Sequence, residues 1–286
     1  MAEVARAEGL RAAVLRRFVA MRRGGGIAAG LCAAFPAVRD RMLHDPGFLF
    51  KLGVEVWGDV ALSVLSEVNS RSKNFWDEAE FFVTDVLATV VLNATVVTML
   101  STSATLGRSP GGRLSLLMNA RVDGKLNDFL RLLGNRVPVN MPSSFFAAAP
   151  AGLAPYSPQM RVLALVFQGA RIAALSAGVG LAGQGAANTV CELRRRFAPE
   201  GYSAEYAGNV SPHAPPLLEP ALEWGVFMGT SANLRQHLIM GLERALEGSA
   251  LGARVPKLAA LGSAAMRVGN NVWGGEQFAQ RWGRRA

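Results

Sequence analysis

The clearest feature of the hydropathy pattern is a run from Val86 to Gly107, in which 22 residues include no Asp, Glu, Lys, Arg or His. At about 1.5 Å of rise per residue, a helix of this length crosses roughly 30 Å of hydrocarbon. A second run, Ile172 to Cys191, has 20 residues and also lacks charge. These runs predict two long helices, Phe81–Leu106 and Met160–Cys191, and we expect both to span a membrane.

Other predicted helices carry charges within their apolar pattern. Phe48–Val68 contains four charged residues in 21, which makes a full span expensive, so an interfacial or packed helix is predicted. Leu217–Gly248 is predicted as one long helix or a broken pair, and Pro256–Trp273 as another helix. These two provisional spans insert only if their charges face protein or water. The pattern therefore predicts an all-α, polytopic helical membrane protein with about four transmembrane helices plus amphipathic helices.

The N-terminal region is basic and amphipathic, with six arginines and two glutamates between Met1 and Arg23. It is compatible with an organelle transit segment or with a surface helix on a membrane or on the protein. Three glycines, 24–26, predict a joint, and a short helix to Met42 is followed by a break at His44-Asp45-Pro46. A short helix is also expected near Leu126–Leu133. We divide the chain into a basic N-terminal region (1–42), a helical membrane domain (43–280) and a basic tail (281–286).

Composition narrows the function classes. Half of the residues are hydrophobic, mean hydropathy is +0.22, and 30 basic residues against 21 acidic ones give a net charge of +9. This charge suits an acidic membrane surface or loops placed by their positive charge, and no nucleic-acid-binding module is visible. Phosphate-binding glycine loops, G-x-S-x-G and H-E-x-x-H motifs are missing. We expect no enzyme activity, no cofactor, no metal and no nucleic-acid partner.

Small and polar residues recur at steps of four in both predicted spans. The second span has a ridge of Ala170, Ala174, Gly178, Ala182 and Ala186, which permits close approach of two helix backbones. Gln184 and Asn188 in the same span either hold helices together or line a substrate pathway. In the first span, Asp85 shares a face with Thr89 and Asn93; it could bind a cation, pair with an arginine or face the headgroup region.

The densest group of polar residues lies in the third segment. Glu219/Glu223 and Glu243/Glu247 are two acidic pairs, each with both carboxylates on one helix face. Adjacent carboxylates repel, which favours a bound cation or one raised pKa. The alternative is a solvated face paired with Arg235, Arg244 or Arg267. Further on, Asn270-Asn271 and Gly274-Gly275 suggest an unwound polar helix end that lines a cavity. The candidate substrate-binding residues are Glu219, Glu223, Asn233, Arg235, Glu243, Glu247, Gln184, Asn188 and Asp85.

Six segments follow one another in a recognisable order: DPGFLFKLGVEVWGD (45–59), KNFWDEAEFFVTDVL (73–87), MPSSFF (141–146), GLAGQGAAN (180–188), the stretch Leu217–Ser249 and RVGNNVWGGEQF (267–278). Together they resemble the RETICULATA-related family of plastid envelope membrane proteins. One departure is that Ala147–Ala149 follow MPSSFF where the family pattern has an acidic residue. The resemblance implies a multi-pass protein of the chloroplast inner envelope that supports chloroplast and leaf development. It also implies transport of amino acids, basic ones among them.

The sequence therefore predicts a transporter or exchanger of small metabolites that works by alternating access around the Glu219–Glu247 region. Membrane lipids are its expected surroundings, and a thin four-span bundle favours a homo-oligomer. The main alternative is a non-transporting envelope scaffold that organises partners or lipids through its basic loops. A third possibility is a soluble helical protein with buried apolar helices.

Overall fold

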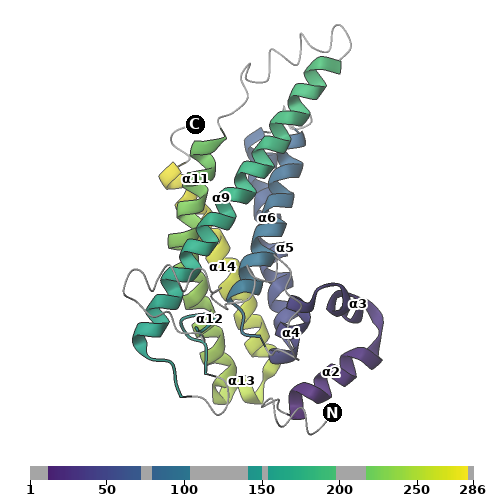
Figure 1. Ribbon diagram of the computed structural model, residues 1–286, viewed down its shortest axis with the longest axis vertical. Coiled ribbons are helices and arrows are strands. Elements are labelled where there is room, and N and C mark those ends of the chain that lie inside the picture. Colours follow the sequence, from purple (N-terminus) through teal and green to yellow (C-terminus); the bar gives the residue numbers. More distant parts are fainter. Residues whose placement is uncertain (1–11, 72–78, 104–140, 150–153, 198–216, 283–286) are drawn as a thin grey trace, which may run out of the picture. The chain divides into compact units, whose positions relative to one another are not determined.

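The computed structural model describes residues 12–71, 79–103, 141–149, 154–197 and 217–282, and within these ranges every regular element is a helix (Figure 1). The all-α prediction is therefore confirmed for this part of the chain. The expected helix near Leu126–Leu133 and the first 11 residues lie outside it. The chain forms two compact units: the first contains residues 1–52 and 95–168, the second residues 53–94 and 169–286.

Three short helices begin the first unit: α2 (Ala12–Gly24), α3 (Gly26–Ala34) and α4 (Pro36–His44). The predicted glycine joint separates α2 from α3, and Gly25 and Gly26 have φ of 60° and 77°, which residues with a side chain rarely adopt. Nη1 of Arg17 in α2 donates to the last carbonyls of α4, on Leu43 and His44, at 3.0 Å each. A cation at a helix C-terminus satisfies carbonyls that lack a partner in the helix.

The predicted break at His44-Asp45-Pro46 is confirmed, and the side chain of Asp45 contacts the residues at the start of the next helix. Its carboxylate accepts from the backbone N–H of Gly47 at 2.8 Å and forms an ion pair with Lys51 at 2.8 Å. α5 (Phe48–Arg71) follows directly. The side chain of Arg41, almost fully buried, donates to the backbone oxygens of Ala37 and Thr98 within the same unit.

Two helices are long and apolar enough to cross a bilayer. They are α6 (Ala79–Leu100), with a candidate span at Phe82–Leu100, and α9 (Pro158–Phe197), with a candidate span at Pro158–Val190. Only 39% and 28% of these spans are buried within the molecule. Among the described residues, the two provisional spans do not meet the same test, so the prediction of about four spans is supported for two.

The second unit ends in α11 (Leu218–Phe227), the π-helical turn η2 (Met228–Ala232), α12 (Asn233–Gly248), α13 (Ala250–Arg254) and α14 (Pro256–Trp282). The long helix predicted from Leu217 is thus continuous but contains one wider turn, and α12 and α14 pack side by side (Figure 1). The unwound helix end predicted at Asn270–Gly275 is wrong. α14 continues through these residues to Trp282. The other part of the prediction, that these residues line a cavity, is confirmed.

Small residues bring α9 and α11 into backbone contact. A Cβ atom on Gly229 would lie 2.6 Å from the backbone oxygen of Gly169, and one on Gly225 would lie 2.8 Å from the oxygen of Ala173. The ridge predicted on α9, Ala170, Ala174, Gly178, Ala182 and Ala186, is exposed and does not make this contact within the chain. The neighbouring face of α9 meets α11 because Gly225 and Gly229 leave space for it.

Candidate functional site

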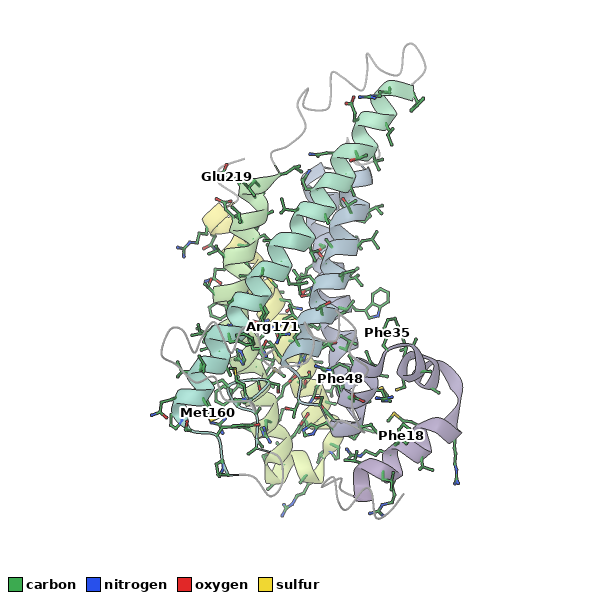
Figure 2. The ribbon with its side chains drawn as sticks, viewed as in Figure 1. Phe18, Phe35, Phe48, Met160, Arg171 and Glu219 are labelled. Carbon is green, nitrogen blue, oxygen red and sulfur yellow. The ribbon has the colours of Figure 1, made fainter. Side chains whose placement is uncertain are left out.

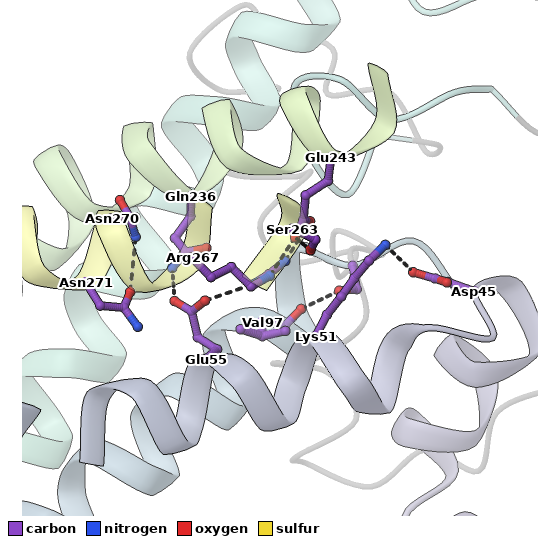
Figure 3. Close-up of polar contacts among 11 residues, drawn as sticks. Asp45, Lys51, Glu55, Val97, Gln236, Glu243, Ser263, Arg267, Asn270 and Asn271 are labelled. Atoms are coloured by element: carbon purple, nitrogen blue, oxygen red, sulfur yellow. Dashed lines mark hydrogen bonds and ion pairs between the residues drawn. The ribbon is translucent and has the colours of Figure 1, made fainter. Parts of the chain in front are cut away.

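A buried ion network joins α5, α12 and α14 in the second unit (Figure 3). Arg267 donates two parallel hydrogen bonds of 2.7 Å to Glu243, from Nε to Oε1 and from Nη2 to Oε2. Its Nη1 donates to Oε2 of Glu55 at 2.8 Å. All three residues are at most 3% exposed. Paired hydrogen bonds between arginine and carboxylate are the strongest form of this contact and fix the positions of both groups.

Two neutral side chains complete the network. Gln236 donates to Oε1 of Glu55, and Ser263 donates to Oε1 of Glu243. Every carboxylate oxygen of the two glutamates therefore accepts a hydrogen bond, which is the condition for burying such charges without a large penalty. The network fixes α12 and α14 against α5 and fixes the position of the Glu55 carboxylate.

Beside this network, the second unit contains a cavity of about 740 Å³. This volume is typical of pockets for small molecules. Glu55 lies at its wall, so the cavity and the ion network share one carboxylate. Helices α5, α6, α9, α11, α12 and α14 all contribute to the lining. Its main polar residues are Glu55, Asp59, Asp85, Asn93, Gln184, Arg235, Gln236, Asn270, Asn271 and Glu276.

Asp59 is the acidic group of the cavity that is most affected by its surroundings. Burial, with a smaller effect of the nearby Glu55 carboxylate, raises the pKa of Asp59 to about 7, although a hydrogen bond from Asn93 and the charge of Arg235 oppose the shift. Asp59 belongs to α5, outside the two candidate spans. A carboxyl group that titrates near neutral pH can bind a cation or carry a proton.

Arg235 is the basic group of the cavity. Its Nε donates to Oδ1 of Asn270 at 3.1 Å, and its Nη1 donates to Ser231 and Gln277, both at 2.5 Å. The guanidinium carbon also lies 5.2 Å from the ring centre of Phe227, a distance at which the ring face attracts a cation. These contacts hold the guanidinium in one position at the cavity wall.

An aromatic cluster forms the apolar part of the cavity. The ring centres of Trp224 and Phe278 are 4.9 Å apart in an edge-to-face arrangement, and those of Phe227 and Phe278 are 5.1 Å apart. Aromatic groups at such distances pack rigidly and bury large apolar areas. The cavity thus combines opposite charges, amides and an apolar wall, as binding sites for small amphiphilic molecules do.

Three of the residues predicted as substrate-binding line this cavity: Asp85 from α6, Gln184 from α9 and Arg235 from α12. Thr89 and Asn93, which were expected to share a face with Asp85, line it as well. Gln184 also donates to Oδ1 of Asn188 at 2.9 Å, and Asn188 borders a separate depression near Glu192.

The predicted acidic pairs do not form two-carboxylate sites. Glu219 is exposed at the first turn of α11 (Figure 2), and Glu223 is half-buried; neither lines the cavity. Glu243 is buried against Arg267, whereas Glu247 on the next turn is exposed. Asn233 is buried and does not line the cavity; its side chain lies near Gly169 of α9. Binding of substrate by these residues stays a prediction.

Sequence reasoning did not single out Glu55 and Asp59 as site residues. The available signal was their spacing of four on the largely apolar helix Phe48–Val68, which places both carboxylates on one face. In the sequence alone, these charges argue against a span and do not by themselves indicate a site. Among the described residues, no group of three or more His, Cys, Asp or Glu side chains is arranged to hold a metal ion.

Comparison with known proteins places these features in a family. The family model described as RETICULATA-like, "Protein RETICULATA-related", matches residues 40–242. The chain is 33% identical to "Protein RETICULATA, chloroplastic" of Arabidopsis thaliana, an alignment that covers 99% of this chain and 60% of that protein. It is 32% identical to "Protein RETICULATA-RELATED 1, chloroplastic" of the same plant, covering 97% of this chain and 59% of that protein. The chain thus spans about three fifths of the length of these relatives. No solved structure shows significant similarity.

Proposed function

Because this chain belongs to the RETICULATA-like family, we propose that it is a multi-pass protein of the chloroplast inner envelope that transports or exchanges small metabolites. Amino acids, basic ones among them, are the proposed substrates. The proposal includes a role in chloroplast and leaf development. Two relatives have names that describe them as chloroplastic, and this supports the chloroplast as the compartment.

Exposed apolar stripes support insertion in a membrane. On α6, Val83, Leu87 and Val91 recur at steps of four and are each at least half exposed. The provisional spans have comparable stripes. One runs along the continuous segment of α11 and α12, with Leu218, Leu222, Val226, Leu234, Leu238 and Leu242, and the other lies on α14, with Leu261, Val268 and Val272. In water such continuous apolar surfaces are costly, whereas lipid tails cover them without penalty. We propose that these stripes face lipid, which gives about four spans in total.

The cavity is the observation that carries the transport proposal. It places Asp59, Arg235 and several amides around a space of about 740 Å³, inside a unit whose outer surface is apolar. Polar groups inside a membrane protein are expensive and usually mark a substrate pathway. The ionised carboxylate of Asp59 would bind the ammonium group of an amino acid, and the aromatic cluster would contact its carbon chain.

Alternating access requires that helices around the cavity move relative to one another. The contact of α9 with α11 and η2 brings the backbones together at Gly169, Ala173, Gly225 and Gly229. The π-helical turn Met228–Ala232 lies directly at this contact. Such turns are frequent at functional sites in helices. We place the moving contact here. Since the ridge on α9 is exposed, we also propose that several copies assemble.

Uptake into liposomes tests the proposal. Purified protein is reconstituted, and uptake of labelled lysine, arginine and ornithine is measured with and without unlabelled amino acid inside. We expect uptake that depends on internal substrate and that is reduced at least tenfold by Asp59→Asn. The matched control is the double variant Glu219→Gln, Glu223→Gln, which changes two acids outside the cavity and should retain uptake. No uptake above empty liposomes, from protein shown to be folded and inserted, would favour the scaffold.

A further inference from the structure

Arg235 is a buried cation that forms no ion pair with any residue that the structure describes. It is 8% exposed, and its three hydrogen-bond partners, Asn270, Ser231 and Gln277, are neutral. Arg267, 32 positions further along the chain, is 2% exposed and contacts two carboxylates. Arg267 is therefore neutralised by direct ion pairs, whereas Arg235 interacts with the charge of Asp59 without forming an ion pair with it.

The charge of Arg235 is costly in this setting. A buried ion without a directly bonded counterion loses its hydration, and neutral hydrogen-bond acceptors compensate only part of that loss. Its Nη2 nitrogen donates to no described residue, although Nε and Nη1 both do. An anion in the cavity would form the direct ion pair that Asp59 does not form and would supply a partner for this nitrogen.

A second donor lines the same cavity. Asn271 is 9% exposed, its Oδ1 accepts from Asn270 at 3.2 Å, and its Nδ2 has no hydrogen-bond partner. Buried amide nitrogens without a partner are rare in folded proteins and indicate a missing ligand or water. Arg235 and Asn271 thus offer the cavity two donors and no competing acceptor of their own.

We propose that Arg235 and Asn271 bind the carboxylate of the substrate, while Asp59 in the same cavity binds its ammonium group. The inference rests on the proposed function, because it assigns the ends of the molecule that the cavity accepts. The substrate class is then small zwitterions with a carboxylate and an amine, and simple amines are excluded. The acids Glu55 and Asp59 in the lining favour a singly charged carboxylate over a doubly charged phosphate, which would meet stronger repulsion.

Binding to the purified full chain in detergent tests this assignment. Three probes share an amine-bearing chain and differ at one end: lysine has a carboxylate, lysine amide has a neutral amide, and 1,5-diaminopentane has neither. We expect lysine to bind at least tenfold more tightly than the other two, because loss of a charge-assisted hydrogen bond costs about that factor or more. The affinities are measured by isothermal titration calorimetry.

Two glycines of α14 provide a matched pair of variants. A Cβ atom on Gly274 would lie 2.6 Å from Nη2 of Arg235, whereas one on Gly269, which does not line the cavity, would meet nothing within 4 Å. Gly274→Ala therefore displaces the guanidinium group without removing its charge. We expect Gly274→Ala to weaken lysine binding about tenfold and to leave 1,5-diaminopentane binding unchanged. Gly269→Ala should bind all three probes as the parent protein does, and Arg235→Gln should abolish the preference for lysine.

The outcomes separate this inference from the proposed function. If lysine and lysine amide bind equally, or if no probe binds, the carboxylate assignment is wrong, whatever the liposomes show. If lysine is preferred in binding but no uptake occurs, transport fails and the carboxylate site stands. Because Gly274→Ala retains every charge of the cavity, it keeps the test decisive even if Arg235→Gln does not fold.

Discussion

Buried charge in the second unit is concentrated in a few side chains whose partners differ. Arg267 contacts Glu243 and Glu55, so one cation forms ion pairs with two anions from two other helices. Removal of one partner from such a network leaves a buried charge without compensation. The contribution of each residue therefore depends on its neighbours more than on its own type, and two glutamates one turn apart can have opposite importance.

We predict that Glu243→Gln lowers the free energy of unfolding by roughly 3–5 kcal/mol, the usual cost of breaking a buried ion pair. The same change at Glu247, exposed on the next turn of α12, should have an effect within about 0.5 kcal/mol. Thermal unfolding in detergent, followed by far-UV circular dichroism, measures both. Equal midpoints for the two variants would contradict the role assigned to the network.

Asp59 makes substrate affinity depend on pH. Burial and Glu55 raise its pKa to about 7, so the carboxyl group is mainly protonated below that pH and ionised above it. Only the ionised form attracts an ammonium group, so lysine should bind about tenfold more weakly at pH 6 than at pH 8. The other charged groups of the cavity are Glu55, which Arg267 holds, Arg235, and the exposed Asp85 and Glu276.

The control for this pH effect is Asp59→Asn. The variant should bind lysine weakly at both pH values, because the amide neither titrates nor attracts a cation. Calorimetric titrations at pH 6, 7 and 8 give the comparison. A parent protein whose lysine affinity is flat over this range would remove Asp59 from the role of ammonium partner, and an unchanged slope in the variant would assign the titration to another group.

At the scale of elements, the contact of α9 with α11 and η2 depends on glycines, which have no side chain to keep the two backbones apart. A methyl group on Gly229 would lie 2.6 Å from atoms of Gly169 and Ala173, so the helices would have to separate. We expect Gly229→Ala to destabilise the protein by about 1–3 kcal/mol, as overpacking does. Gly178→Ala has open space around it and should stabilise by up to about 1 kcal/mol through helix propensity.

The thermal unfolding midpoints of Gly229→Ala and Gly178→Ala test this prediction, because both variants carry the same substitution. The midpoint of Gly229→Ala should fall and that of Gly178→Ala should rise. If both variants are stabilised, α9 and α11 do not pack through these glycines, and the moving contact proposed for transport loses its basis.

The positions of the main elements could be predicted because charge and proline mark them directly. The uncharged runs identify α6 and α9, and Asp45-Pro46 marks the start of α5. The face of α9 that packs could not be predicted, since Gly169 and Ala173 alternate with Ala170 and Ala174, and both sets recur at steps of four. Only the position of α11 decides between them.

The cavity was predictable only in part, for a similar reason. Asp85 and Gln184 stand out as polar residues within apolar runs, and Arg235 as one charge within a polar group. The ion network could not be read from spacing, because Arg267 and Glu55 are 212 positions apart. The sequence likewise predicts Glu243 as a substrate-binding carboxylate, whereas in the structure Arg267 binds it.

For the whole molecule, the solvent that covers the apolar stripes determines how many helices span the membrane. α6 and α9 meet the length and hydropathy needed for a bilayer, whereas α12 carries charges together with its stripe of Leu234, Leu238 and Leu242. If α12 also spans, its buried face must satisfy those charges internally, and the pairing with Arg267 does so for Glu243. Insertion of α12 then depends on the fold of the complete unit and not on its hydropathy alone.

We therefore predict that α12 lies in lipid in the reconstituted protein. Single cysteines at Leu238, on the stripe, and at Glu247, near the end of the helix, are spin-labelled in a background lacking Cys32 and Cys191. The label at 238 should collide with oxygen, which concentrates in lipid, and the label at 247 with a water-soluble nickel chelate. Water exposure of both labels would place α12 outside the bilayer and reduce the span count to the two helices that hydropathy alone identifies.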